Sequence, residues 1–207
     1  GGALAELGAA GEAQAAFQPA LNLQPENPEA LRGMGNVLVS LDRPQEALAQ
    51  FEIAQRVAPN DPRIYNSLGV VLDKLAMHDG AQQYYRAGLE ISPGNLTLQN
   101  NLGLSLALGG KFNEALAILR QAAANPGANA RNRQNLALVY GLSGSQEQAA
   151  QIGRIDLDEA SVQSNLAYYE LLRALADQSR AAAIGATPGR LAVPTAPTPV
   201  QAQPIKR

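Results

Sequence analysis

The chain has 207 residues, of which 46% are hydrophobic and 16% charged, and its formal net charge at pH 7 is −2. The sequence lacks the clustered lysine and arginine that phosphate binding requires, which argues against a nucleic-acid-binding protein. The chain has no cysteine, which excludes disulfides and thiolate metal sites within it, and no apolar run approaches the roughly 20 residues of a membrane-spanning helix.

The sequence repeats itself at a step of 34 residues, which is the signature of a repeat protein. One column is always alanine: Ala13, Ala47, Ala81, Ala115 and Ala149. Parallel columns hold glycine, a bulky residue and proline: Gly35, Gly69 and Gly103; Phe17, Phe51, Tyr85 and Leu119; Pro25, Pro59 and Pro93. These columns resemble the tetratricopeptide repeat (TPR) family. The resemblance implies an all-α solenoid of antiparallel helix pairs, with small residues at the helix crossings and bulky residues between the helices.

The first repeat is expected to be incomplete. The columns place Ala13, Phe17 and Pro25 in the second helix of a repeat whose first helix is mostly missing. The sequence begins with Gly1 rather than with methionine, so we expect a fragment or a processed form. Any signal peptide or lipid-accepting cysteine would then lie upstream.

Three full repeats follow, over about 28–61, 62–95 and 96–129. Asn27-Pro28 and Asp61-Pro62 each have a capping side chain followed by proline, which is typical of a helix start. In the second repeat the two helices are expected over about 28–41 and 44–58.

The fifth repeat loses the pattern in its second helix, since Gly153 takes the bulky column and Asp156 a later small column. This helix should therefore stop near Ile155. A further helix is expected over about 158–183 and should cap the solenoid, because the last repeat needs an atypical terminal unit. Residues 1–183 then form the solenoid of about four and a half repeats with its capping helix, and the Pro-rich residues 184–207 form a flexible tail.

No group of residues forms a catalytic or metal-binding pattern. His78 is the only histidine and falls between two predicted helices, where we expect a solvated loop side chain; zinc requires three or four clustered ligands. Asp156, Asp158 and Glu159 suit an acidic helix start better than a calcium loop. Because no nucleophile has a plausible base, we predict a protein without catalytic activity, cofactor or metal, unless catalysis resides in an upstream domain.

The TPR resemblance implies that a protein partner binds the wall formed by the first helices of the repeats. In repeats two and three this wall is polar and charged: Glu29, Arg32, Asn36, Arg63, Ser67, Asp73 and Lys74. In repeats four and five it carries leucines, which suit an amphipathic helix or a peptide with hydrophobic anchors unless the C-terminal helix folds back over them. The predicted partner-binding groove comprises Asn66, Asn100, Asn101, Leu104, Leu108, Arg131, Gln134, Asn135, Leu138 and Leu142.

A series of amides accompanies the leucines. Asn101 and Asn135 occupy one column, and Asn165 follows on the expected capping helix. A primary amide can donate to and accept from a peptide backbone at once, so such a series can hold an extended chain. The alternative is that asparagine before Leu-Gly is a common feature of TPR sequences of any function.

One TPR function can be compared position by position. Chaperone-binding members hold a C-terminal carboxylate with basic residues and asparagines from three successive repeats. Arg32 and Asn36 match that pattern, whereas Ser67, Thr97 and Asn101 do not. We therefore exclude this class of partner.

A narrower resemblance covers residues 111–175, through the run Arg133-Gln134-Asn135-Leu136-Ala137-Leu138, the broken helix before Asp156-Leu157, and Asn165-Leu166-Ala167-Tyr168. These features resemble the TPR lipoprotein of bacterial tight adherence (Tad, or Flp-type) pilus assembly systems. The resemblance implies an outer-membrane-anchored periplasmic pilotin that binds the pilus secretin, with a stoichiometry that follows the secretin ring. The membrane is reached only through an upstream lipid anchor. Two alternatives remain: a cytoplasmic TPR adaptor with an unrelated client, and the TPR region of a larger glycosyl- or sulfotransferase.

Overall fold

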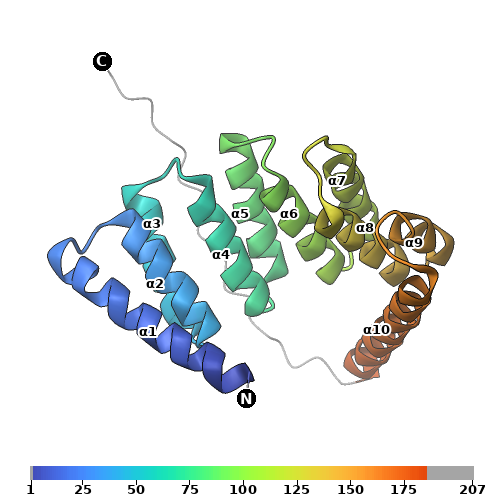
Figure 1. Cartoon of the computed structure of the whole chain (residues 1–207), viewed down its shortest axis with the longest axis horizontal. Coiled ribbons are helices and arrows are strands. Elements are labelled where there is room, and N and C mark those ends of the chain that lie inside the picture. Colours follow the sequence, from blue (N-terminus) through green and yellow to red (C-terminus); the bar gives the residue numbers. More distant parts are fainter. Residues whose placement is uncertain (1, 186–207) are drawn as a thin grey trace. The chain divides into compact units, whose positions relative to one another are not determined.

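A computed structural model describes the backbone of residues 2–185 and the side chains of residues 10–175 (Figure 1). The described residues form ten α-helices and no strand, which confirms the predicted all-α fold. The helices are α1 (Gly2–Leu23), α2 (Pro28–Ser40), α3 (Pro44–Val57), α4 (Pro62–Lys74), α5 (His78–Ile91), α6 (Leu96–Leu108), α7 (Phe112–Ala124), α8 (Ala130–Leu142), α9 (Gln146–Gly153) and α10 (Glu159–Gly185). The tail was predicted from residue 184, but α10 continues to Gly185, and residues 186–207 lie outside the described residues.

The helices group into two units, and each is described by itself. The first comprises the described residues up to Asn101, and the second begins at Leu102, so that the boundary falls within α6. In the first unit α2 packs on α3 and α4 packs on α5, with α3 against α4 between the pairs. In the second unit α8 packs on α9, and α7 packs on α8. These hairpins are visible in Figure 1.

Side-chain caps start the first helices of the pairs, as the sequence predicted. The Asn27 Oδ1 atom accepts a hydrogen bond from the Ala30 backbone N–H at 3.0 Å, and Asp61 Oδ1 accepts one from the Arg63 N–H at 2.9 Å. These acceptors satisfy backbone donors that have no partner inside the helix.

The turn within each pair contains one residue with a left-handed backbone, and these residues recur at the same step of 34. Their φ angles are 57° at Asp42, 58° at Ala76, 76° at Gly110 and 86° at Gly144. Only glycine adopts this region without a steric penalty from Cβ. The turns at Asp42 and Ala76 are therefore strained, whereas those at Gly110 and Gly144 are not.

The glycine column allows the two helices of a pair to approach closely. A Cβ atom at Gly35 would lie 2.3 Å from Phe51 Cε1, and one at Gly69 would lie 2.3 Å from Tyr85 Cε1. Both aromatic rings are buried, and the alanines of the repeated column are buried beside them. The bulky column thus fills the space that the missing glycine side chains leave open.

The incomplete first repeat packs differently from the others. Helix α1 continues from Gly2 through the region near residue 8 where the 34-residue step would place a turn. Phe17 lies against α2, where a Cβ at Gly33 would meet its Cζ at 2.3 Å.

The fifth repeat ends early, as predicted, because α9 stops at Gly153. Helix α10 packs against α8 and α9, and the buried Tyr169 lies where a Cβ at Gly141 would meet its Cδ2 at 2.4 Å. The guanidinium of Arg133 on α8 pairs with Asp156 at 2.6 Å and fixes the segment between α9 and α10.

Candidate protein-binding surfaces

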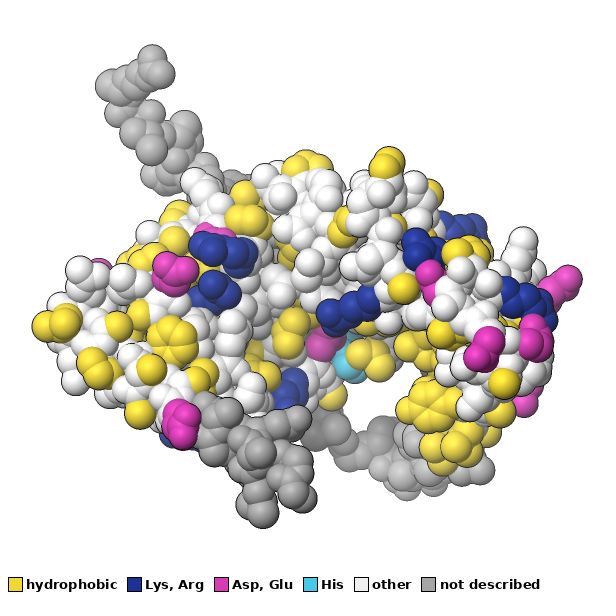
Figure 2. All heavy atoms as spheres, viewed as in Figure 1, with side chains coloured by type: hydrophobic (Ala, Val, Ile, Leu, Met, Phe, Trp, Pro, Cys, Tyr) yellow, Lys and Arg dark blue, Asp and Glu magenta, His cyan; other side chains and the backbone are white. Residues whose placement is uncertain are grey.

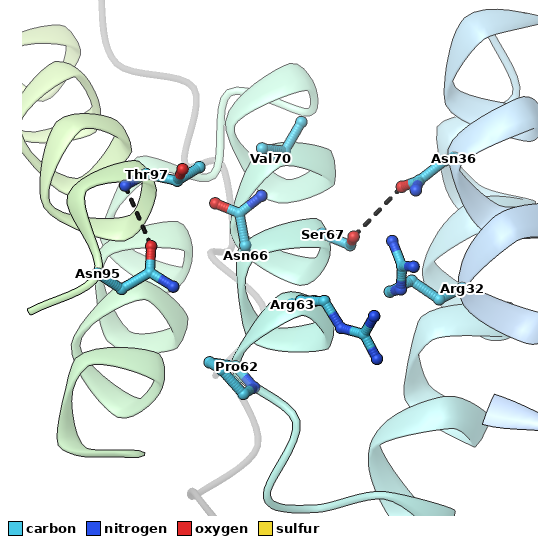
Figure 3. Close-up of a pocket in the computed structure, with 9 residues that line it drawn as sticks. All are labelled: Arg32, Asn36, Pro62, Arg63, Asn66, Ser67, Val70, Asn95 and Thr97. Carbon is cyan, nitrogen blue, oxygen red and sulfur yellow. Dashed lines mark hydrogen bonds between the residues drawn. The ribbon is translucent and has the colours of Figure 1, made fainter. Parts of the chain in front are cut away.

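The first unit contains an open pocket of about 320 Å³ between α2, α4 and the start of α6 (Figure 3). Four of its lining residues, Arg32, Asn36, Arg63 and Ser67, belong to the polar and charged wall of repeats two and three. The others are Pro62, Asn66, Val70, Asn95 and Thr97. The pocket therefore lies in repeats two to four, and of the predicted groove residues it includes only Asn66.

Amide hydrogen bonds link the neighbouring first helices of this unit. The hydroxyl of the buried Ser67 donates to Asn36 Oδ1 at 3.2 Å, and Asn101 Nδ2 donates to Asn66 Oδ1 at 2.8 Å. The predicted groove residues Asn66 and Asn101 are thus brought together, but the hydrogen bond between them uses the side-chain oxygen of Asn66 and an N–H of Asn101. Asn100, which was also predicted to line the groove, is only 4% exposed and lies in the interior.

Two arginines lie opposite each other in the pocket, Arg32 on α2 and Arg63 on α4 (Figure 3). Arg63 binds Asp61 through Nε and Nη2, with a shortest separation of 2.8 Å. This hydrogen bond, together with the nearby charge of Arg32, lowers the pKa of the Asp61 carboxyl. Arg32 itself makes no hydrogen bond or ion pair with the described residues, and its Nε atom is fully enclosed.

The prediction for His78 was wrong. It is the first residue of α5, and its Nδ1 lies 2.8 Å from Asp73 Oδ1, while the hydroxyl of Tyr85 donates to Asp73 Oδ2 at 3.0 Å. Burial is the main cause that raises the pKa of Tyr85, with the negative charge of Asp73 second. The three side chains cross-link α4 and α5, so the structure gives His78 a role in packing the pair.

In the second unit the first helices carry apolar residues on two faces. On α8, Leu136 and Val139 are buried against the neighbouring helices, whereas Leu138 and Leu142 on the other face remain half-exposed. On α6, Leu106 is buried, Leu104 is half-exposed and Leu108 is 61% exposed. Of the remaining predicted residues on α8, Arg131 is exposed and Asn135 is half-buried. Gln134 is also half-buried, and both polar atoms of its side chain are enclosed. The buried leucines already pack the helix pairs, so the second apolar face, formed by Leu104, Leu108, Leu138 and Leu142, is not needed for that packing.

Sequence reasoning missed an apolar stripe on α10, formed by Tyr168, Leu171 and Leu175, which are 55%, 56% and 49% exposed. Figure 2 shows hydrophobic side chains gathered along this helix. Of the adjacent Tyr168 and Tyr169, only Tyr169 is buried. Neighbouring residues on a helix point about 100° apart, so one of two adjacent tyrosines can pack while the other faces outward.

Neither a metal site nor a membrane span is found in the part of the chain that the structure describes. No three His, Asp or Glu side chains there lie close enough together to hold a metal ion. None of the described helices combines the length and hydrophobicity needed to cross a bilayer.

Comparison with known proteins identifies the repeats. Models described as "Tetratricopeptide repeat" match residues 4–69 and residues 62–95. Residues 4–95 are tetratricopeptide repeats. No curated protein matches the sequence.

Solved TPR structures resemble the chain beyond the matched repeats. TTC0263 of Thermus thermophilus, a thermophilic TPR protein, has a TM-score of 0.67 and 23% identity, over 81% of this chain and 94% of that one. YrrB, described as a TPR protein with an unusual peptide-binding site, has a TM-score of 0.59 and 25% identity, over 78% and 85%. MamA of Desulfovibrio magneticus has a TM-score of 0.62 and 20% identity, over 76% and 86%.

The TPR repeats and the TPR neighbours together support a protein-binding scaffold. TPR folds are interaction modules and generally not catalysts, and none of these neighbours is described as an enzyme.

Proposed function

We propose that the partner of this scaffold is a secretin subunit of a Tad-type pilus, and that the protein acts as a pilotin at the periplasmic face of the outer membrane. The proposal rests first on the resemblance of residues 111–175 to the TPR lipoprotein of those systems. The segment that carries this resemblance includes α8, the shortened α9 and the start of α10.

The observation that supports a peptide-binding role for this segment is the second apolar face of α6 and α8. Leu104, Leu138 and Leu142 are only half-buried, and Leu108 is mostly exposed. An apolar side chain that leaves water on binding contributes about 25 cal/mol for each Å² it buries. Apolar anchors from a secretin segment would supply such burial, and in this proposal Asn135 of α8 binds the segment's backbone.

Several parts of the resemblance have a structural explanation of their own. Arg133 and Asp156 form a 2.6 Å ion pair, and the Arg133 hydrogen bonds lower the pKa of Asp156. Gly153 gives room to Val162 of α10, whose nearest atom would lie 3.3 Å from an added Cβ. These residues shape the end of the repeat array, so we assign them a positioning role and assign binding to the open face of α8.

A secretin segment that orders on binding loses conformational entropy, so the affinity of a single site is expected to be modest. A ring of secretin subunits and a lipid anchor on each pilotin would raise the effective concentration and compensate for this. The proposal therefore includes an outer-membrane location, reached through a lipidated cysteine upstream of the present sequence.

The experiment is co-purification of the full-length gene product with the secretin from detergent-solubilised membranes of its own bacterium. Leu104→Glu and Leu138→Glu each place a charge in the proposed interface and should abolish recovery of the secretin. Ile91→Glu is the matched control, because Ile91 is a 37% exposed aliphatic residue at the end of α5. The secretin should still co-purify with this variant.

Recovery of the secretin with both Leu104→Glu and Leu138→Glu would move the interface away from α6 and α8. Absence of the secretin from the wild-type preparation, together with an unmodified cytoplasmic gene product, would reject the pilotin proposal in favour of a cytoplasmic adaptor.

A further inference from the structure

The pocket of the first unit retains hydrogen-bond donors but few acceptors. Asn36 and Asn66 each use their side-chain carbonyl oxygen within the fold, to accept from Ser67 and Asn101. The Nδ2 groups of Asn36 and Asn66 make no hydrogen bond to the described residues and stay available as donors. The ligand that fits such a surface presents acceptors, as the carbonyl oxygens of an extended backbone do.

The same pocket has an incomplete charge balance. Arg63 directs Nε and Nη2 to Asp61, and Nη1 makes no hydrogen bond within the described residues. Arg32 has neither an ion pair nor a hydrogen bond there, and its Nε is enclosed without a partner. The two acidic groups that act on these arginines are Asp61, which is engaged by Arg63, and the exposed Glu29. Neither acidic residue lines the pocket.

An enclosed arginine N–H without an acceptor is costly, because the group loses water without gaining a partner. A planar carboxylate is the natural complement of a guanidinium, since it can accept two parallel hydrogen bonds. Figure 3 shows the side chains of Arg32 on α2 and Arg63 on α4 pointing toward each other.

We propose that this pocket binds an internal, extended segment of a partner protein through one Asp or Glu side chain, held by Arg32 and Arg63. The lining continues on both sides of the two arginines, to Asn36 on α2 and to Asn95 and Thr97 at the start of α6. A bound chain can therefore pass through the pocket rather than end in it. The Nδ2 groups of Asn36 and Asn66 hold its backbone carbonyls, and the 36% exposed Val70 contacts an adjacent apolar side chain.

This inference rests on the chain being a protein-binding scaffold but not on the secretin as its partner. It also concerns a different set of residues from the leucines of α6 and α8. If the protein failed to bind the secretin in cells, the inference about this pocket would still stand. If the preference for acidic peptides described below were not found, the secretin proposal would still stand.

The test is selection of binders from a random peptide library whose members are acetylated at the N-terminus and amidated at the C-terminus, with the whole 207-residue chain as the target. The selected peptides should carry Asp or Glu at one fixed position. For the best peptide, replacing that residue by Gln or Asn should weaken binding about tenfold or more, as expected for a hydrogen-bonded charge pair. The affinity should also fall as salt is added.

Arg32→Gln in the protein should weaken binding to a similar degree and remove the distinction between Glu and Gln peptides. The matched control is Arg56→Gln, on the exposed end of α3, which should bind like the wild type. Circular dichroism establishes that both variants are folded.

The proposal would be overturned by selected peptides without an acidic residue, by binding that is unchanged in Arg32→Gln, or by the absence of any selected peptide. A strong preference for peptides with a free C-terminal carboxylate over the blocked ones would also overturn it, because the anion would then come from a chain end and not from an internal side chain.

Discussion

The close approach of the helices at Gly69 can be tested by adding one methyl group. An ideal Cβ at this position would lie 2.3, 2.5 and 2.7 Å from three ring atoms of Tyr85. The ring cannot move aside easily, because Tyr85 is only 1% exposed and its hydroxyl is hydrogen-bonded to Asp73. Gly69→Ala should therefore overpack the pair, which typically costs about 1–3 kcal/mol.

The same substitution also has a favourable effect, since alanine is a better helix former than glycine by about 1 kcal/mol. Gly80→Ala separates the two contributions. Gly80 lies in the partner helix α5, and its added Cβ would meet only Leu72 Cδ1, at an ordinary 3.4 Å. The difference in unfolding free energy between the two variants then approximates the overpacking cost, about 2–3 kcal/mol at so short a contact.

Urea denaturation followed by helical circular dichroism measures both variants. Gly69→Ala should unfold at lower urea than the wild type, and Gly80→Ala at equal or higher urea. Equal stability of the two variants would refute the account of the glycine column. In the fifth repeat the small and bulky positions change together. Ala137 replaces the glycine, and Gly153 replaces the bulky residue.

Three further predictions concern local features. Tyr85→Phe removes the hydroxyl that binds Asp73 and should lower the unfolding free energy by about 1–3 kcal/mol, as measured by urea denaturation; an unchanged midpoint would contradict it. Ala76→Gly relieves a left-handed alanine with φ of 58° and should stabilise the protein by up to about 1 kcal/mol, whereas Gly110→Ala should destabilise it by about 1–2 kcal/mol; opposite signs in thermal melts would refute the turn analysis. Hydrogen bonds from Arg154 and, second, from Gln163 lower the pKa of Glu159 from 4.5 to about 2, so these contacts stabilise the fold above pH 4.5 and lose their effect as the pH falls toward 2. In Arg154→Gln, NMR titration of the Glu159 carboxyl should show a pKa that rises toward 4.5, and a value still near 2 would rule out Arg154 as the main cause.

The 34-residue columns predicted the helices well because the same few contacts recur in every pair. Ala47, Ala81 and Ala115 are all fully buried, and a small residue at a helix crossing is readable from sequence. The early end of α9 was also predictable, since Gly153 cannot fill the space of a bulky residue.

Other features depend on contacts that the columns do not encode. The contact of His78 with Asp73 crosses a turn whose left-handed residue is Ala76, and an alanine gives no sign of that conformation. Asn100 and Asn101 are adjacent in sequence, yet one is buried and the other binds Asn66, because a step of one residue rotates a side chain by about 100° around the helix. The enclosed Nε of Arg32 follows from three-dimensional packing alone.

The most direct test of the central claim, that partners bind the first helices of the repeats, is hydrogen–deuterium exchange of the full-length protein with and without its co-purified partner. The account predicts protection of the first helices α2, α4, α6 and α8, or of some of them, with no change in the second helices α3, α5, α7 and α9. Protection confined to the second helices, α3, α5, α7 and α9, would contradict it.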